Sequence, residues 1–348
     1  MTDTTRACVI HAAKDLRVET RPLAQPGAGE VLVRVAAGGV CGSDLHYYLD
    51  GGFGAIRVRE PMILGHEVAG RIEALGAGVS GFSIGAAVAL NPSRPCGQCV
   101  YCRAGAAQHC LDMLFWGSAM RTPHVQGGFR ERIVVPAAQC VPVGDDASPA
   151  EAAMCEPLAV AMHAVRQAGD VRGRRVLVTG CGPIGALVLL AARDAGAREV
   201  IVTDVIDEPL AFASRLGATR AVNVARDAAA LSAEARDKGQ IDVAFECSGH
   251  PRALAQAIEL TRPQGVIVQV GIGGSLDVPL NVVTAKELNL RGSFRFHEEF
   301  AAAATAIATR RIDVRPLVTA SLPLDRAVEA FELAADKRQS MKVQLTFA

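Results

Sequence analysis

The cysteines offer the first chemistry that the sequence suggests, because four of them share one short stretch, Cys96-Gly-Gln-Cys99-Val-Tyr-Cys102-Arg-Ala-Gly-Ala-Ala-Gln-His-Cys110. The spacing C-x2-C-x2-C-x7-C lets four thiolates form a tetrahedral shell around Zn²⁺ without ligands from elsewhere. Gly97 and Gly105 relax the backbone for such a tight loop. A closed shell of thiolates leaves no open coordination position, so we expect a structural zinc ion. Disulfides and an iron–sulfur cluster are the alternatives.

A second metal site is suggested by residues spread over three segments. These are Cys41-Gly-Ser43-Asp44-Leu-His46, Gly65-His66-Glu67 and Cys155-Glu156-Pro157. Catalytic zinc takes about three protein ligands and keeps one position open, and Cys41, His66 and a carboxylate would supply that set. The alternative is a buried, hydrogen-bonded His66 with Glu67 in solvent, because neighbouring side chains of a regular strand point to opposite faces.

A glycine-rich turn predicts a dinucleotide site. Gly180-Cys181-Gly182-Pro183-Ile184-Gly185 is a G-x-G-x-x-G motif that follows the strand pattern RVLVT and opens a helical stretch. The first glycine makes the turn, the second lets the backbone approach a pyrophosphate, and the third allows close helix–strand packing. The free N–H groups at the helix N-terminus would hold the phosphates. We therefore expect cofactor contacts from this loop, the alternative being a turn into a packed helix with no ligand. The predicted contacts are Gly180, Gly182, Pro183, Ile184 and Gly185.

The residues after the next strand favour NAD over NADP. Asp204 ends the strand EVIVTD, where a carboxylate accepts hydrogen bonds from the adenosine ribose and repels a 2′-phosphate. The following residues add Asp207 and Glu208 but no lysine or arginine. Val270, at the end of GVIVQVG, is a further predicted cofactor contact.

Composition excludes several other classes of function. The chain has 348 residues, enough for about two domains, and 36 Lys+Arg balance 36 Asp+Glu. A formal charge of zero provides no global basic field for nucleic acid or an anionic membrane. The N-terminus does not resemble a signal peptide and no apolar run reaches ~18 residues. We expect a cytoplasmic protein, in which ten cysteines serve metal binding or chemistry more often than disulfides.

The pattern of hydrophobic residues changes along the chain and divides it into two parts. Residues 1–155 contain short Val/Ile-rich runs broken by Gly and Pro, which indicates a β-rich domain. Strand and helix patterns then alternate, which indicates a parallel sheet with helices on both faces. The predicted strands are 175–180, 199–205, 241–249 and 265–271, and the predicted helices are 183–195, 209–216 and 252–260. After residue 285 we expect a strand in ELNLRGSF, a helix over 297–310 and a final strand, KVQLTF, that returns to the first domain.

Six motifs in fixed order carry a family resemblance over essentially the whole chain. They are CGSDLHYY, ILGHEVAGRIEALG, CGQCVYC…C, CEPLAVAMHAV, GCGPIG and ECSG. The pattern resembles the zinc-dependent medium-chain dehydrogenases, and within them the polyol branch typified by sorbitol dehydrogenase. The resemblance implies an α/β fold in which a GroES-like catalytic domain (1–155 and 286–348) receives an inserted, doubly wound Rossmann NAD-binding domain (156–285). It also implies NAD, two Zn²⁺ per chain and a homo-oligomer, with a tetramer favoured.

The resemblance assigns roles residue by residue. Cys41, His66 and Glu67 match the zinc ligands of the polyol branch, and Glu156 matches a glutamate that approaches the zinc or holds its water. Either carboxylate, Glu67 or Glu156, could therefore contact the metal. Alcohol dehydrogenases use a cysteine as the third ligand near positions 155–156, but the register of the motif EPLAV favours Glu156 over Cys155. One departure is Ala86-Ala87, where relatives usually carry Asp-Arg.

The same resemblance implies the reaction. An alcohol transfers hydride to NAD⁺ while zinc lowers the pKa of its hydroxyl group. Ser43 and His46 match the positions that relay the proton, and Tyr47 and Arg295 match substrate contacts.

The substrate is suggested by the segment Phe115-Trp-Gly-Ser118-Ala-Met-Arg121-Thr-Pro-His124-Val-Gln126-Gly-Gly-Phe129. It is similar to the corresponding segment of L-idonate 5-dehydrogenases, which oxidise a sugar acid to 5-keto-D-gluconate. A substrate carboxylate needs a fixed cation or donors, and arginine suits bidentate capture. Ser118, Arg121 and His124 are candidates, with Arg295 as a second cation.

Other interpretations remain open at this stage. The segment could be an ordinary loop with Arg121 in solvent and His124 only packed. The enzyme could oxidise sorbitol, xylitol or an arabinitol, or, with a poorer match, threonine. A NAD-binding sensor without catalysis is the alternative from another class. A nucleic-acid zinc module is a remote alternative, because the zero net charge and the dehydrogenase motifs both disfavour it.

Overall fold

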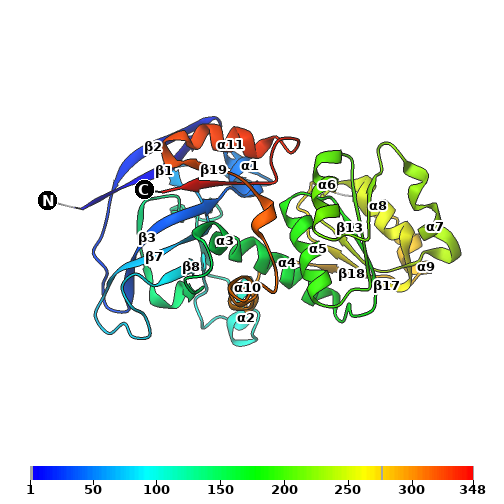
Figure 1. The fold of residues 1–348 in the computed structure, drawn as a ribbon, viewed down its shortest axis with the longest axis horizontal. Helices are drawn as coiled ribbons and strands as arrows, with labels where there is room; N and C mark the ends of the chain where they lie inside the picture. The colour runs from blue at the N-terminus through cyan, green and yellow to red at the C-terminus, as the bar shows by residue number, and fades with distance from the viewer. Residues whose placement is uncertain (1–2, 276, 348) are drawn as a thin grey trace. The chain divides into compact units, whose positions relative to one another are not determined.

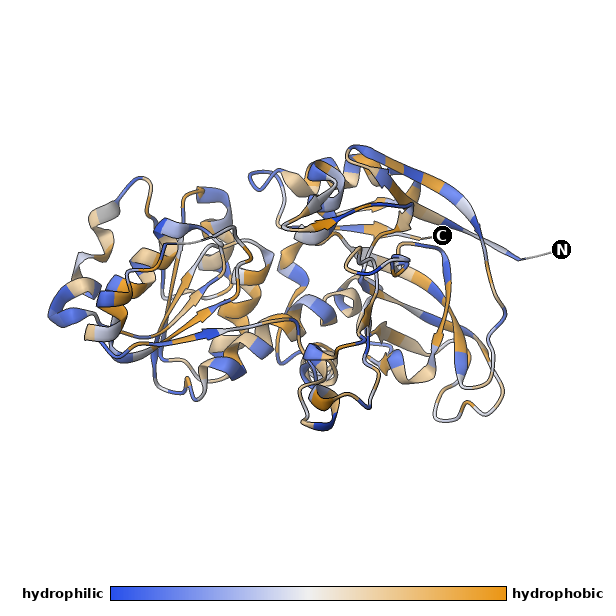
Figure 2. Cartoon of the chain, turned by 180° about the vertical axis from the view of Figure 1, so that it is seen from behind, coloured by the Kyte–Doolittle hydropathy of each residue, from blue (hydrophilic) through white to orange (hydrophobic). Residues whose placement is uncertain are grey.

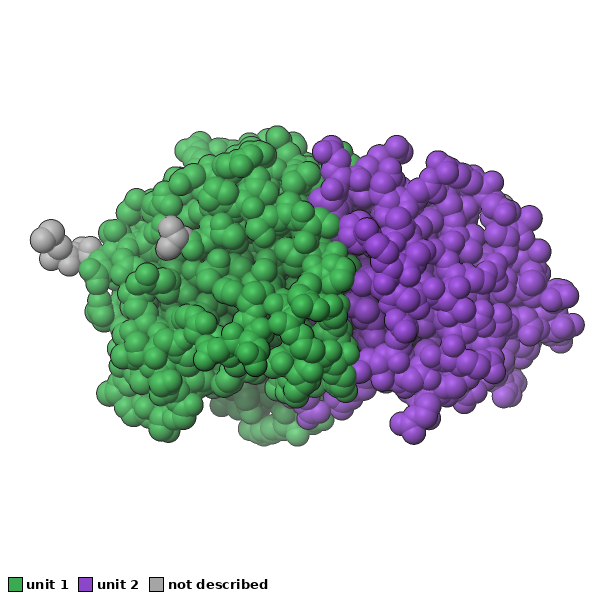
Figure 3. Space-filling view, viewed as in Figure 1, with its two compact units in different colours: residues 1–156, 300–336, 342–348 green, residues 157–299, 337–341 purple. Residues whose placement is uncertain are grey.

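The protein is described by a computed structural model that covers residues 3–275 and 277–347. The chain forms two compact units, coloured separately in Figure 3. Unit 1 comprises Met1–Glu156, Phe300–Asp336 and Lys342–Ala348, and unit 2 comprises Pro157–Glu299 and Lys337–Met341. The chain re-enters unit 1 at Phe300, later than the residue 286 expected from sequence, because the intervening strand pairs within the sheet of unit 2.

Unit 1 is built on a seven-stranded sheet in the order β12-β8-β7-β3-β20-β19, with β11 also paired to β3. The C-terminal strand β20 pairs antiparallel with β3, so the predicted return of the tail to the first domain is confirmed (Figure 1). The strands are β3 Glu30–Gly39, β7 Glu67–Leu75, β8 Ala87–Leu90, β11 Arg132–Pro136, β12 Cys140–Pro142, β19 Val318–Pro323 and β20 Lys342–Thr346.

Smaller elements complete unit 1. A three-stranded sheet joins β1 (Thr4–Ala12), β2 (Asp15–Pro22) and β6 (Met62–Ile63). The short pairs are β4 (Gly52–Phe53) with β5 (Ile56–Arg57), and β9 (Ser93–Arg94) with β10 (Leu114–Phe115). The helices are α1 Gly42–Asp50, α2 Val100–Arg103, α3 Pro149–Ala153, α10 Glu299–Ala308 and α11 Ala327–Ala335. Helix α4 (Cys155–Ala168), which the sequence analysis did not assign, carries the chain from Glu156 into unit 2.

One face of strand β3 lies in the core of unit 1. Val31, Val33 and Val35 of β3 are fully buried, as the two-residue period of a strand requires. The ring of Phe129 packs against Phe331 and Phe347 in the same core.

Unit 2 contains a six-stranded sheet in which every pairing is parallel, in the order β15-β14-β13-β16-β17-β18. Numbered along the chain this is the order 3-2-1-4-5-6 of a doubly wound dinucleotide-binding fold, so the predicted α/β class is confirmed. The strands are β13 Arg175–Thr179, β14 Glu199–Asp204, β15 Arg220–Asn223, β16 Ile241–Glu246, β17 Thr261–Gln269 and β18 Asn289–Gly292. The helices are α5 Pro183–Asp194, α6 Asp207–Arg215, α7 Ser232–Ala235, α8 Pro251–Leu260 and α9 Leu280–Ala285.

Hydrophobic runs explain why these strands are central. Leu177, Ile201 and Ala244 are fully buried, and the strands of this sheet are mostly orange in Figure 2. Within the described residues, no helix is both long and apolar enough to cross a membrane.

Candidate active site

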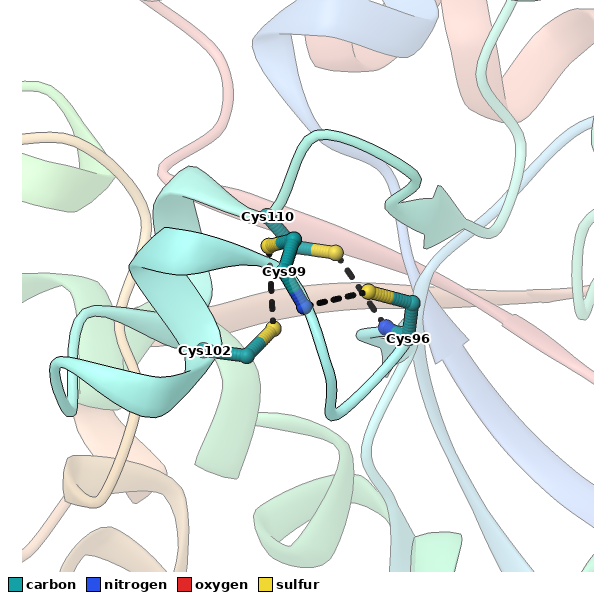
Figure 4. A group of neighbouring side chains, drawn as sticks. All are labelled: Cys96, Cys99, Cys102 and Cys110. Atoms are coloured by element: carbon teal, nitrogen blue, oxygen red, sulfur yellow. Dashed lines mark hydrogen bonds between the residues drawn. The ribbon is translucent and has the colours of Figure 1, made fainter.

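The four predicted cysteine ligands gather around one point, with the sulfur atoms of Cys96, Cys99, Cys102 and Cys110 within 4.8 Å of one another (Figure 4). A tetrahedral zinc site with bonds of about 2.3 Å would place its sulfurs roughly 3.8 Å apart, so this cluster fits zinc with little movement. Backbone N–H groups also point at the sulfurs: Cys96 donates to Cys110 Sγ at 3.1 Å and Cys99 to Cys96 Sγ at 3.4 Å. Hydrogen bonds from the backbone at Cys102 and Leu111 lower the pKa of Cys99 to about 6. All ten cysteines are free, which sets the disulfide alternative aside.

A second group joins residues from two segments of unit 1. Cys41 Sγ, a ring nitrogen of His66 and a carboxylate oxygen of Glu67 lie within 4.8 Å of one another. His66 is 5% exposed and Glu67 1% exposed, so the alternative that placed Glu67 in solvent is wrong.

The backbone at Gly65 explains how two neighbours face the same site. Gly65 has φ +89°, and a Cβ there would lie 2.1 Å from the ring of Phe129, so only glycine fits. Regular strand geometry begins only at Glu67, where β7 starts. His66 therefore escapes the alternation that would separate it from Glu67.

Asp44 holds the two segments together from inside the core. Its carboxylate accepts hydrogen bonds from the backbone N–H of Cys41 at 3.0 Å and of Gly65 at 3.2 Å. Burial raises the pKa of Asp44, and the nearby His66 opposes that rise. The Nδ1 atom of His66 lies 3.9 Å from this carboxylate and is buried without a hydrogen-bond partner. A buried ring nitrogen without a partner is costly, and metal binding with a small ring movement toward Asp44 would satisfy it.

Lys342, the first residue of β20, contacts the second group, and sequence reasoning did not identify it. Its Nζ donates to both carboxylate oxygens of Glu67 at 2.8 Å and to the carbonyl of Val40 at 3.1 Å. Burial opposes its charge, but Glu67 and Cys41 raise its pKa above the ordinary value. The available signal was a single lysine at the start of the predicted strand KVQLTF.

Glu156 and Cys155, at the start of α4, stand outside the group of three. Glu156 is buried, and burial together with Glu67 and Cys41 raises its pKa to about 8, although His66 and Lys342 oppose the rise. Cys155 is fully buried, and burial raises the pKa of its thiol. Glu67 is thus the carboxylate that the structure groups with Cys41 and His66.

Helix α1 carries the predicted relay and one predicted substrate contact. Ser43 is half-buried in the first turn. His46 is exposed and its Nδ1 lies 3.2 Å from Asp50. Tyr47 is buried and its hydroxyl accepts a hydrogen bond from the N–H of Ala119 at 3.0 Å.

The predicted substrate segment begins beside His66, because the Phe115 and His66 rings lie 5.3 Å apart. Ser118 is buried and pairs through its backbone with Val125. Both ring nitrogens of His124 are already engaged: Nε2 accepts from the N–H of Arg59 at 2.9 Å, and Nδ1 faces the carbonyl of Arg121 at 2.6 Å. This engagement favours the packing interpretation of His124.

The Arg121 side chain is 42% exposed and pairs with the Asp112 carboxylate at 2.5 Å. Its charge is therefore already matched by a carboxylate of the chain. The other predicted cation, Arg295, belongs to unit 2, where its guanidinium lies 4.9 Å from the ring centre of Phe294.

The glycine-rich turn of unit 2 has the geometry of a phosphate loop. A Cβ on Gly185 would lie 1.9 Å from the carbonyl of Gly180, whereas one on Gly182 would meet nothing within 4 Å. The third glycine thus permits close packing, and the space beside the second remains open for a pyrophosphate. Helix α5 begins at Pro183 with Gly182 as its N-cap, and Ile184 follows in its first turn.

Asp204 ends β14 beside that turn. Its carboxylate accepts hydrogen bonds from the N–H groups of Cys181 at 2.6 Å and Val205 at 2.7 Å. The residues directly after β14 include no lysine or arginine, but the fold brings an arginine to them. Arg226, beyond β15, pairs with Asp207 at 2.6 Å. Val270 is half-buried, and its N–H donates to the carbonyl of Glu246.

Two family profiles match the sequence. The alcohol dehydrogenase GroES-like domain matches residues 27–145, and the zinc-binding dehydrogenase family matches residues 183–309.

Named relatives cover nearly the whole chain. The chain is 42% identical to the L-idonate 5-dehydrogenase (NAD(P)(+)) of Escherichia coli (strain K12), with 99% of each chain covered. It is 35% identical to the sorbitol dehydrogenase of Homo sapiens, with 93% of this chain and 91% of the relative covered. The crystal structure of the Escherichia coli L-idonate 5-dehydrogenase matches with a TM-score of 0.96, covering 100% of this chain and 99% of that one.

Proposed function

The chain belongs to the zinc-binding alcohol dehydrogenase family, and on that premise we propose that it oxidises a sugar acid, L-idonate to 5-keto-D-gluconate, with NAD⁺. The observation that carries the substrate is the 42% identity, over 99% of both chains, to a relative named for this activity. The buried group of Cys41, His66 and Glu67 supports the chemistry.

The residues of the site have distinct tasks in this proposal. Cys41, His66 and Glu67 would hold the catalytic zinc, with Glu156 as a further buried carboxylate. When bound, zinc acts as a Lewis acid that lowers the pKa of the substrate hydroxyl, and NAD⁺ accepts hydride. Ser43 receives the hydroxyl proton and passes it toward His46, whose exposure and contact with Asp50 suit release to water.

A polyol such as sorbitol, xylitol or an arabinitol is the second candidate substrate. Sorbitol dehydrogenases at 34–35% identity support it, and so does the ion pair that already occupies Arg121. A sugar acid differs from these substrates by one carboxylate, so the two candidates are separable by kinetics.

The remaining parts of the proposal concern the cofactor, assembly and location. NAD is favoured because Asp204 lies where a 2′-phosphate would be repelled, although the name of the relative includes NAD(P). A homo-oligomer, with a tetramer favoured by family resemblance, is supported by β18, an edge strand whose four residues are all exposed. We place the protein in the cytoplasm.

A substrate panel with both cofactors tests the proposal. The purified enzyme is assayed on L-idonate, sorbitol, xylitol, arabinitol and threonine by the absorbance of the reduced nicotinamide. We expect the highest kcat/KM with L-idonate and NAD⁺, and loss of activity in Cys41→Ser. A preference for sorbitol would establish the second candidate, and no reduction of either cofactor would favour a NAD-binding sensor.

A further inference from the structure

The proposed sugar-acid substrate carries a carboxylate, which a fixed cation or a set of donors would bind. This inference rests on that proposed function. A sugar acid carries one carboxylate group that a polyol lacks. An arginine with two free parallel N–H groups is the side chain best suited to bind that carboxylate. Arg121 is a poor candidate because the Asp112 carboxylate already pairs with it at 2.5 Å.

A short hairpin directly after α1 offers another arginine. Its strands β4 and β5 pair Gly52 with Arg57 and Phe53 with Ile56. The ring of Phe53 lies 5.8 Å from the ring of His46 and 5.5 Å from the ring of Tyr47. Through Phe53, the hairpin therefore contacts one residue predicted to relay the proton and one predicted to contact substrate.

The guanidinium of Arg57 is fixed at one nitrogen and available at the others. Its Nη1 donates to the carbonyl oxygens of Gly54 and Ile56, both at 2.8 Å. Those two bonds orient the planar group and leave the edge formed by Nε and Nη2, which is the edge that binds a carboxylate with two parallel hydrogen bonds. Within the described residues, no carboxylate forms an ion pair with Arg57, in contrast to Arg17, which Asp15 engages at 2.6 and 2.7 Å.

The chain beyond the hairpin is tied to the predicted substrate segment. The N–H of Arg59 donates to His124 Nε2 at 2.9 Å, and the Glu60 carboxylate accepts from the N–H of His124. That segment starts at Phe115, in ring contact with His66. Hydrogen bonds thus join the chain beyond the hairpin to the predicted substrate segment, and the first residue of that segment contacts His66.

We propose that Arg57 binds the carboxylate of the sugar-acid substrate through Nε and Nη2. It thereby sets the preference for a sugar acid over a polyol of the same length. His124 contributes by holding the segment against the hairpin, which explains why both of its ring nitrogens are engaged by backbone groups.

The test compares L-idonate with sorbitol in Arg57→Met and Arg57→Lys, using the zinc-loaded enzyme and NAD⁺. Methionine keeps much of the length and removes the charge, whereas lysine keeps the charge but cannot form two parallel bonds. Arg17→Ala, which removes another exposed arginine of unit 1, is the matched control. We expect Arg57→Met to lower kcat/KM for L-idonate roughly 10- to 100-fold, mainly through KM, and to change that for sorbitol less than about threefold.

Each outcome bears on a different conclusion. A smaller loss in Arg57→Lys than in Arg57→Met supports the charge as the recognised feature. If Arg57→Met still oxidises L-idonate and the ratio of the two kcat/KM values is unchanged, the proposed role of Arg57 is wrong. The proposed substrate is not affected by that outcome. If the unaltered enzyme does not oxidise L-idonate, both the proposed substrate and this role fall.

Discussion

At the scale of single residues, the pair of Glu67 and Lys342 decides the character of the catalytic group. The two side chains are almost wholly buried and meet through two contacts of 2.8 Å. A buried ion pair gains little over apolar packing, but removing one partner leaves an uncompensated charge in the core. The lysine therefore places a compensating positive charge against the carboxylate, beside a thiol and an imidazole.

Replacing that lysine should destabilise the protein strongly. We expect Lys342→Met to lower the free energy of unfolding by about 3–5 kcal/mol, because it strands the charge of Glu67. Denaturant unfolding measures the change, and the exposed Lys238→Met is the control. Adding Glu67→Gln to Lys342→Met should recover part of the loss. No recovery in the double variant would contradict the ion-pair explanation.

The two clusters of ligands also predict a metal content. We expect two zinc ions per chain by elemental analysis. Cys41→Ser should remove one of them and Cys99→Ser the other, since the two sets of ligands share no residue. Loss of both ions in either variant would show that the sites depend on each other.

At the scale of elements, local irregularities place the chemistry. Helix α1 has Cys41 as its N-cap, so four of the predicted site residues lie in this helix or at its N-cap: Cys41, Ser43, His46 and Tyr47. The bend at Gly65 turns His66 toward Cys41 just before β7 begins. Short helices and glycine bends therefore bring together side chains that regular strands would separate.

The first residue of α10 predicts a pH dependence. Burial opposes the ionisation of Glu299, but hydrogen bonds from His163 and from the N–H groups of His297 and of Glu299 itself hold its pKa at about 2. A carboxyl with a lowered pKa stabilises the fold fully above its ordinary value of 4.5 and loses that contribution as the pH falls toward 2.

Thermal unfolding of wild type and Glu299→Gln across this range checks that dependence. We expect the wild type to be more stable above pH 5 and the difference in Tm to shrink as the pH falls toward 2. A difference that is constant with pH would contradict the assignment. His163→Gln, which removes one of the side chains that contact the Glu299 carboxylate, should reproduce the effect in part.

At the scale of the whole molecule, the edge of the parallel sheet predicts assembly. All four residues of β18 are exposed, and Leu290 and the nearby Phe294 are 42% and 39% exposed. Unprotected edges of this kind pair readily with another chain. We expect a homo-oligomer by light scattering, and Leu290→Lys should shift it toward smaller species. A monomeric wild type would contradict the expectation.

Much of this protein was readable from sequence where the relevant residues are close together in the chain. The four cysteines and the glycine-rich turn each lie within one short segment, so spacing alone defines their geometry. The alternation of strand and helix likewise predicted the parallel sheet, although β15 and α4 went unassigned because short or apolar runs do not separate strand from helix.

Only the tertiary structure decided what depends on distant contacts. Glu67 joins Cys41 and His66 because Lys342, 275 positions away along the chain, neutralises it in the core. Arg121 forms an ion pair with Asp112. The Nε and Nη2 edge of Arg57, in contrast, has no carboxylate partner among the described residues. The sequence determines which hydrogen-bond donors and charged groups the chain contains. Folding determines which of them already have partners, because pairing depends on contacts between segments that no local pattern encodes.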